Sequence, residues 1–264
     1  MNWLRVHILV ALACIIANGV PLSAAQPGEV ITAANVDSVA EQVSPGMRWC
    51  IQHGMNLTIG PYKRVILPKA YTAATEQYAG QVRLGDNATR LDGYVAGMPF
   101  PSLDPNDPEL ATKIMWNYYY RPYFTDDYAW QNFAADTGPI NPNAGMSIER
   151  SYAVRHFGRL FYNGRLYVDP KPVLPNQEGF RYKEIIGPIL EPFDLKGVNT
   201  LNYHYMDPHQ PDDTWLYFPT LRRVRRLSTA QRSDAILGQD FDIDSNDGYS
   251  GSPMWMTWRF LGEK

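Results

Sequence analysis

The residues of this chain best suited to chemistry lie near its end, in the acidic stretch Asp240–Gly248. Its aspartates alternate with other residues, and oxygen ligands at alternating positions are typical of calcium-binding loops. Such a loop also needs glycine at its sixth position and a carboxylate at its twelfth. Counted from Asp242, these positions hold Asp247 and Pro253. The stretch therefore fails the calcium template twice, and we expect an ordinary acidic loop.

The segment Gly248–Ser252 comes close to a second motif, the nucleophile elbow of serine hydrolases. The motif requires a second glycine where this chain has Ser252, and a helix should begin where Pro253 stands. A glycine-rich turn fits these residues better. A hydrolase that uses Ser250 or a pair of aspartates is therefore the least favoured function.

Histidines give no metal site either. His204 and His209 lie five residues apart with Asp207 between them, and no known zinc motif has this spacing. His156 is a third candidate, expected where a strand begins, and ordinary polar positions explain all three histidines. We predict no catalytic residue, no metal and no cofactor.

A run of arginines favours binding over catalysis. Its members are Arg222, Arg223, Arg225 and Arg226. Guanidinium groups match phosphate and carboxylate through parallel hydrogen bonds, so the run is a candidate site for an anionic headgroup. The alternative is a solvated strand whose arginines pair with residues 233–250, which hold five aspartates and no basic residue.

Aromatic residues supply the candidates for an apolar ligand site. The strand expected at Trp215–Phe218 is apolar on both faces, which suggests a sheet with apolar material on each side. Pockets for acyl, sterol or terpenoid ligands are mostly apolar. A core or interface layer is the alternative, because aromatic residues dominate cores as well. The ligand-lining candidates are Trp116, Tyr118, Tyr119, Tyr162, Tyr167, Trp215 and Tyr217.

The elements that would position these residues follow from local patterns. Helices are expected at 45–53, 68–78 and 110–120, where a capping residue or a proline opens each segment. Strands are expected at 55–59, 198–206, 215–218 and 255–260, and hairpins at 81–95 and 156–169. In the second hairpin Asn163 and Gly164 form the turn and pair Tyr162 with Arg165. The fold class predicted is α+β and β-dominated: an antiparallel meander with short helices.

The first residues predict export. Residues 1–25 contain one basic residue, a short apolar run and small residues before Gln26, as in a cleaved signal peptide. A lipoprotein signal at Cys14 is disfavoured by its context. Without Arg5 the chain has 23 basic and 27 acidic residues, a balance that argues against nucleic acid as a partner. One cysteine, Cys50, remains, so no internal disulfide is expected.

Several long motifs resemble a family of Gram-negative envelope proteins known as domain of unknown function 1329, which is described as similar to outer-membrane lipoprotein-sorting proteins. The matching segments are 64–78, 93–101, 104–108, 113–118, 121–127 and 215–251. The resemblance implies a curved antiparallel half-barrel, similar to the periplasmic lipoprotein carriers, with short helices on one side. It implies no catalytic residues. Family members continue well beyond the position of Lys264, so we expect a truncated member: a signal peptide at 1–25 and one incomplete domain at 26–264, with a sheet incomplete at its C-terminal edge.

These observations lead to one preferred function and two alternatives. The preferred function is a periplasmic binder or carrier of a lipophilic molecule, such as a lipid, an acyl chain or a lipoprotein. Its partners would be an inner-membrane exporter and an outer-membrane acceptor. The first alternative is a non-catalytic adaptor or sensor that docks through an exposed sheet edge. The envelope hydrolase ranks last.

Overall fold

The computed structural model describes residues 25–85, 90–124, 126–141, 145–227, 232–236 and 239–262. The chain divides into two compact units. The first comprises residues 1–63 and 140–146, and the second comprises 64–139 and 147–264. Residues 1–24 of the expected signal peptide lie outside the described part, and the assignment of 26–264 to one domain stays a prediction. Among the described residues, no helix is both long and apolar enough to cross a bilayer.

The first unit is built around one short helix. Helix α1, Pro45–Gln52, begins as predicted, because the Ser44 side chain accepts a hydrogen bond from the Met47 amide at 3.1 Å. Strand β1, Val30–Ile31, pairs with β2, Leu57–Thr58, which is shorter than the strand expected at 55–59. The unit also holds η1 (Val36–Val39), β6 (Ile140–Asn141) and β7 (Gly145–Met146). Its small core consists of Ile31, Val36, Val39 and Ile51.

The second unit contains a six-stranded sheet. Its strands are β5 (Tyr128–Thr137), β8 (Arg150–Phe161), β9 (Phe180–Glu191), β10 (Asn199–Tyr205), β11 (Asp213–Phe218) and β12 (Arg223–Leu227). Their order across the sheet is β12-β11-β10-β9-β8-β5, and each neighbouring pair is antiparallel. The chain thus passes through the sheet from one edge to the other. The predicted β-dominated antiparallel meander with short helices is confirmed.

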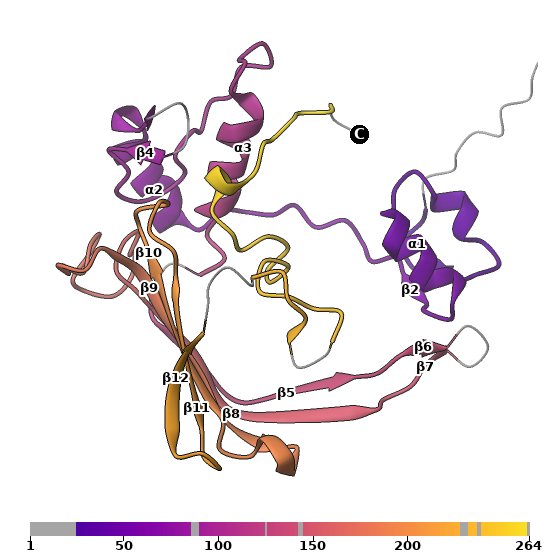
Figure 1. Cartoon of the computed structure of the whole chain (residues 1–264). Coiled ribbons are helices and arrows are strands. Elements are labelled where there is room, and N and C mark those ends of the chain that lie inside the picture. The colour runs from indigo at the N-terminus through magenta and orange to yellow at the C-terminus, as the bar shows by residue number, and fades with distance from the viewer. Residues whose placement is uncertain are drawn as a thin grey trace, which may run out of the picture. The chain divides into compact units, whose positions relative to one another are not determined.

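In the second unit, the two α-helices and the C-terminal segment lie on the concave side of this sheet (Figure 1). The remaining elements of the unit are α2 (Lys69–Tyr78), η2 (Ala79–Gln81), β3 (Arg83–Gly85), β4 (Arg90–Asp92), α3 (Leu110–Tyr119), η3 (Phe193–Leu195) and η6 (Pro253–Trp255). Both helices and the β3–β4 hairpin are where the sequence predicted them. The concave side is called the inner face below, and the opposite side the outer face.

Strand register assigns residues to these two faces, because side chains alternate along a strand and partners in register share a face. Arg159 pairs with Glu184, and Glu184 pairs with Asn202, so these three residues lie together on the inner face. Ile185 and Leu201 lie one position away, on the outer face. The predicted lining residue Trp215 pairs with Leu201 and therefore also lies on the outer face.

The predicted hairpin at 156–169 is wrong. Strand β8 pairs with β5 and β9, and residues 165–169 form an irregular loop. The Asp126 carboxylate accepts hydrogen bonds from the amides of Leu166, Tyr167 and Val168 at 2.6–2.8 Å. The buried Arg165 guanidinium binds Asp127 and nearby backbone carbonyls. These tertiary partners satisfy the backbone that a hairpin would have paired.

The strand expected at 255–260 is also absent from the described residues. A single 3₁₀ turn, η6, takes its first residue, and 256–262 have no regular structure. The Ser252 side chain caps this turn by accepting from the Met254 amide. The Trp258 indole donates to the Pro253 carbonyl at 2.6 Å, a contact within the segment itself. The C-terminal segment thus covers the sheet and adds no strand to it.

Candidate functional site

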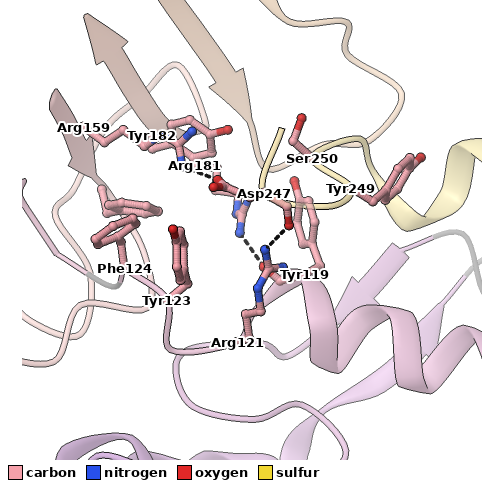
Figure 2. Close-up of a pocket in the computed structure, with 11 residues that line it drawn as sticks. Tyr119, Arg121, Tyr123, Phe124, Arg159, Arg181, Tyr182, Asp247, Tyr249 and Ser250 are labelled. Carbon is pink, nitrogen blue, oxygen red and sulfur yellow. Dashed lines mark hydrogen bonds and ion pairs between the residues drawn. The ribbon is translucent and has the colours of Figure 1, made fainter. Parts of the chain in front are cut away.

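A polar pocket lies on the inner face, where β8 and β9 meet the end of α3 and the C-terminal segment. Figure 2 shows three arginines pointing toward Asp247 from different elements. Arg159 comes from β8, Arg181 from β9, and Arg121 follows α3. The remaining lining residues are Tyr119, Tyr123, Phe124, Phe161, Tyr182, Tyr249 and Ser250. The cavity measures about 50 Å³. At about 10–15 Å³ for each water, this is room for a few water-sized groups.

Arg159 forms the floor of the pocket as part of a buried ion pair. Its Nε donates to Glu184, and its Nη1 lies 3.2 Å from the Asp247 carboxylate. The side chains of Arg159 and Glu184 are only 8% and 7% exposed. Asn202 donates to the other Glu184 oxygen at 2.9 Å, so the carboxylate is fully engaged. Arg159 is therefore committed to carboxylates of this chain.

Arg121 and Arg181 are held differently, by carbonyls and aromatic rings. Arg121 lies 3.8 Å from the Tyr118 ring centroid and donates to the carbonyls of Tyr118 and Asp247, each at 2.7 Å. Arg181 lies 3.7 Å from the Tyr119 ring centroid and donates to the Tyr119 carbonyl at 2.8 Å. Within the described ranges, neither guanidinium has an ion pair with a carboxylate. Each keeps further N–H groups beside the cavity.

A turn at Asp247 and Gly248 ties the C-terminal segment to α3. Both residues have left-handed backbones, with φ of 55° and 89°. The Asp247 carbonyl accepts from the Tyr118 hydroxyl at 2.6 Å as well as from Arg121. A Cβ atom on Gly248 would lie 2.3 Å from that hydroxyl, so the close approach requires glycine.

Three tyrosines around the pocket, Tyr119, Tyr182 and Tyr249, remain neutral hydrogen-bonding groups. Burial raises the pKa of Tyr119 and of Tyr182, because the ionised phenolate loses its solvation. Tyr249 shows the same effect at the rim, where burial raises its pKa to about 12. At neutral pH these hydroxyls therefore keep their protons. The pocket thus presents guanidinium cations and neutral phenols, groups that donate hydrogen bonds to an anion.

A second, smaller cavity of about 10 Å³ lies beside the first. Its wall contains His204, whose Nδ1 lies 2.8 Å from the Asp212 carboxylate. Asp212 also pairs with Arg232, which in turn pairs with Asp244. His209, whose spacing from His204 matches no zinc motif, does not join this group. The described residues contain no cluster of metal-ligating side chains.

An aromatic stripe continues from the pocket along the inner face, and we call it the inner stripe. It comprises Phe124, Tyr128, Trp130, Phe157 and Phe133, with successive ring centroids 3.9–6.1 Å apart. Strict alternation would place Trp130 and Phe133 on opposite faces. The left-handed backbone of Asn132, with φ of 54°, breaks that alternation and the two rings stack. Trp130 and Phe133 are 41% and 38% exposed, so the stripe is open to a ligand.

The seven predicted lining residues do not form one site. Trp116, Tyr118 and Tyr119 lie on α3, and of these Tyr119 lines the main pocket and Trp116 the smaller one. Trp215 and Tyr217 lie on the outer face, where Arg226 stacks on Trp215. Tyr162 is buried against Phe180, and Tyr167 is exposed in the loop after β8. Whether any of them touches a ligand stays a prediction.

The arginine run lies apart from the pocket. Arg223, Arg225 and Arg226 are exposed on the edge strand β12, and Arg222 precedes it with φ of 47°. The alternative interpretation, in which these arginines form ion pairs with the aspartates of residues 233–250, is wrong. Arg226 pairs with Asp213, whereas Asp244 and Asp247 pair with Arg232 and Arg159. The reason is topological, because β12 is at the sheet edge while the acidic stretch returns to the inner face. A headgroup role for the run stays a prediction.

Ser250 lies in a turn of the C-terminal segment. Its hydroxyl donates to the Ile243 carbonyl at 2.5 Å, and its amide donates to the Asp244 carbonyl. The strand before it and the helix after it, which a nucleophile elbow requires, are missing from the described residues. The geometry favours the glycine-rich turn.

The three pocket arginines were not identified from the sequence as candidate site residues. Arg159 had a usable signal, because it interrupts the aromatic positions Phe157 and Phe161 on what becomes one face of a strand, and unpaired charges are rare there. Arg181 sits between Phe180 and Tyr182 and carried the same signal. Arg121 had none, since a basic residue after a helix is common.

Comparisons with known proteins agree with the resemblance noted in the sequence. The model of the family described as "Protein of unknown function (DUF1329)" matches residues 30–264. An uncharacterized protein of Pseudomonas aeruginosa is 24% identical over 251 residues, 92% of this chain and 51% of that protein. The chain thus spans about half the length of that relative. A Vibrio parahaemolyticus crystal structure described as an outer membrane lipoprotein-sorting protein domain matches with a TM-score of 0.32 and 20% identity, over 47% of this chain and 42% of that one.

Proposed function

The chain belongs to the DUF1329 family of proteins of unknown function, and we propose that it is a non-catalytic binder or carrier of a lipophilic molecule in the cell envelope. The observation that carries the proposal is the inner stripe. Large aromatic side chains that remain two-fifths exposed on a concave sheet face are a typical surface for an apolar ligand.

Burial alone supplies the affinity that such a role needs. Each methylene group removed from water contributes about 0.8 kcal/mol. A chain laid along the inner stripe would cover Trp130, Phe133 and Phe157, whose rings already contact one another. The aromatic residues are therefore ordered before the ligand arrives, which lowers the entropy lost on binding.

Location and partners are part of the proposal. The N-terminal sequence pattern supports export to the periplasm with a mature chain that begins at Gln26. We propose that the protein takes its ligand from an inner-membrane exporter and passes it to an outer-membrane acceptor. N-terminal sequencing of the mature protein tests the export step, and a chain lipidated at Cys14 or left uncut would contradict it.

Titration calorimetry with dodecanol, a neutral apolar probe, tests the binding function. Wild-type protein should bind the probe, and Trp130→Ala should weaken binding by about tenfold, because a large aromatic contact is lost. Trp215→Ala is the matched control, since it removes the same side chain from the outer face. Stronger weakening by Trp215→Ala would place the ligand on the outer face, and no binding by wild type would refute a lipophilic ligand.

An adaptor role is the second candidate, and edge strand β12 supports it. All five of its residues are exposed, and one of its sides has no strand partner among the described residues. Such an edge accepts a strand from another protein. A photo-crosslinking residue in place of Val224 would capture an envelope protein if this role holds, and would capture none if it does not.

A further inference from the structure

The pocket beside the inner stripe has more positive than negative charge. Its lining contains three arginines, Arg121, Arg159 and Arg181, and one carboxylate, Asp247. Glu184, behind the lining, neutralises Arg159 further. Three positive charges against two negative ones leave an excess of one. Desolvated cations are stable only when they are paired or hydrogen-bonded, so the pocket is suited to one added negative charge.

The two arginines without carboxylate partners are already held in place. Arg121 is fixed by the Tyr118 ring and two carbonyls, and Arg181 by the ring and carbonyl of Tyr119. Figure 2 shows both guanidinium groups directed into the same cavity. An anion that enters would meet donors whose positions are set before binding. Guanidinium groups bind oxyanions through paired, charge-assisted hydrogen bonds.

We propose that this pocket binds the carboxylate end of the lipophilic ligand, whose apolar chain extends along the inner stripe. The inference rests on the proposed function, because it assigns the polar end of the same ligand. Phe124 lines the pocket and stacks on Tyr128 at 3.9 Å, so the pocket and the stripe are continuous. The cavity of about 50 Å³ holds a few water-sized groups, which is the size of a carboxylate.

The pocket differs from the arginine run on β12, the other candidate for an anionic headgroup. The run is exposed along its whole length, and exposed ion pairs are weak. It also lies at the far edge of the sheet from β5, which carries much of the inner stripe. An anion bound there would be separated from that part of the stripe by four strands. Arg225 therefore provides a matched control for the pocket arginines.

The test compares laurate with dodecanol, two ligands with the same chain length and different end groups. Calorimetry at neutral pH should show that wild-type protein binds laurate about tenfold or more tightly than dodecanol, as expected for hydrogen bonds to a charged group. Arg121→Gln and Arg181→Gln should each reduce that preference while leaving the dodecanol affinity unchanged. Arg225→Gln should change neither. Unaltered dodecanol binding also reports that each variant is folded.

The outcomes separate the two proposals. If dodecanol binds and laurate binds no more tightly, the pocket inference is wrong and the lipophilic-ligand function stands. If Arg225→Gln removes the preference while the pocket variants keep it, the headgroup site is β12 and the inference is again wrong. If neither long-chain ligand binds but acetate does, and Arg121→Gln abolishes acetate binding, the pocket takes small anions and the lipophilic ligand is wrong. If one pocket variant fails to fold, the other pocket variant, compared with Arg225→Gln, decides the inference.

Discussion

Arg181 rests on Tyr119 in two ways at once: its guanidinium lies 3.7 Å from the Tyr119 ring centroid, and its Nη2 donates to the Tyr119 carbonyl at 2.8 Å. This double contact joins strand β9 to the last turn of α3. It also fixes the direction of the arginine within the pocket. The ring and the carbonyl belong to one residue, so substitution of the side chain can separate their contributions.

Loss of the Tyr119 ring should destabilise the second unit. Tyr119→Leu removes the cation–π contact, and we expect the free energy of unfolding to fall by about 2 kcal/mol at this largely desolvated position. Tyr119→Phe keeps the ring and should lose much less. Urea denaturation measures both variants. Equal losses would show that the hydroxyl, and not the ring, makes the contribution.

The buried pair of Arg159 and Glu184 gives a second prediction. Arg159→Leu leaves the Glu184 carboxylate buried with Asn202 as its remaining side-chain partner, and we expect a loss of about 3–5 kcal/mol in unfolding free energy. Arg150→Leu breaks the exposed pair with Asp194 and should lose about 1 kcal/mol or less. A loss at Arg159 no greater than at Arg150 would mean that solvent reaches the pair.

Local signals explain which elements were predictable. Helix α1 follows from the Ser44 cap and Pro45, because both act within one turn of the chain. The turn expected at Asn163 and Gly164 does not form: Gly164 is left-handed as expected, but Asn163 is not, and Asn163 pairs with Val173 instead. The strand after it does not form, because Asp126 binds the amides that the strand would have used. A carboxylate forty residues away leaves no trace in a local pattern.

Strands β5 and β9 were not predicted for a related reason. Gly187 and Pro188 are residue types that disfavour the interior of a strand, yet β9 continues through them from Phe180 to Glu191. In β5 the left-handed Asn132 disturbs the alternation on which strand prediction depends. Pairing with β8 on one side of each strand outweighs these local preferences. The pocket was unpredictable in turn, because its arginines come from elements that meet only in the folded sheet.

The second unit should lose stability at acidic pH, because the Asp212 carboxylate becomes protonated there. Burial opposes ionisation of this carboxyl, but His204 and Arg232 outweigh burial and hold its pKa below its usual 3.8. The ionised form therefore stabilises the fold above about pH 3.8, and this contribution is lost as pH falls through the lower pKa of the folded state. The stability difference between wild type and Asp212→Asn should shrink between about pH 5 and pH 3. Asp240→Asn, at an exposed position, serves as the control. A difference that stays constant with pH would contradict the prediction.

The turn that closes the pocket should not tolerate a side chain. Gly248→Ala must adopt a left-handed backbone and also meets the Tyr118 hydroxyl at 2.3 Å. Gly179→Ala has a similar backbone, with φ of 76°, and open space around its Cβ. We expect about 1–2 kcal/mol of destabilisation at Gly179 and clearly more at Gly248. Thermal denaturation compares the two, and equal losses would show that Tyr118 moves aside without penalty.

The contacts that close the pocket also set an order of assembly. Each strand of the sheet pairs with the strands next to it in chain order, so the sheet can grow by successive short loop closures. The Tyr118 hydroxyl and the Asp247 carbonyl are 129 residues apart in sequence, and Arg159 and Asp247 are 88 apart. Closing loops of that length is slower than adding a neighbouring strand. We therefore expect the sheet and its aromatic contacts to form first, while the pocket arginines are still exposed to solvent. The Asp247 turn should pack against the pocket in the last step of folding.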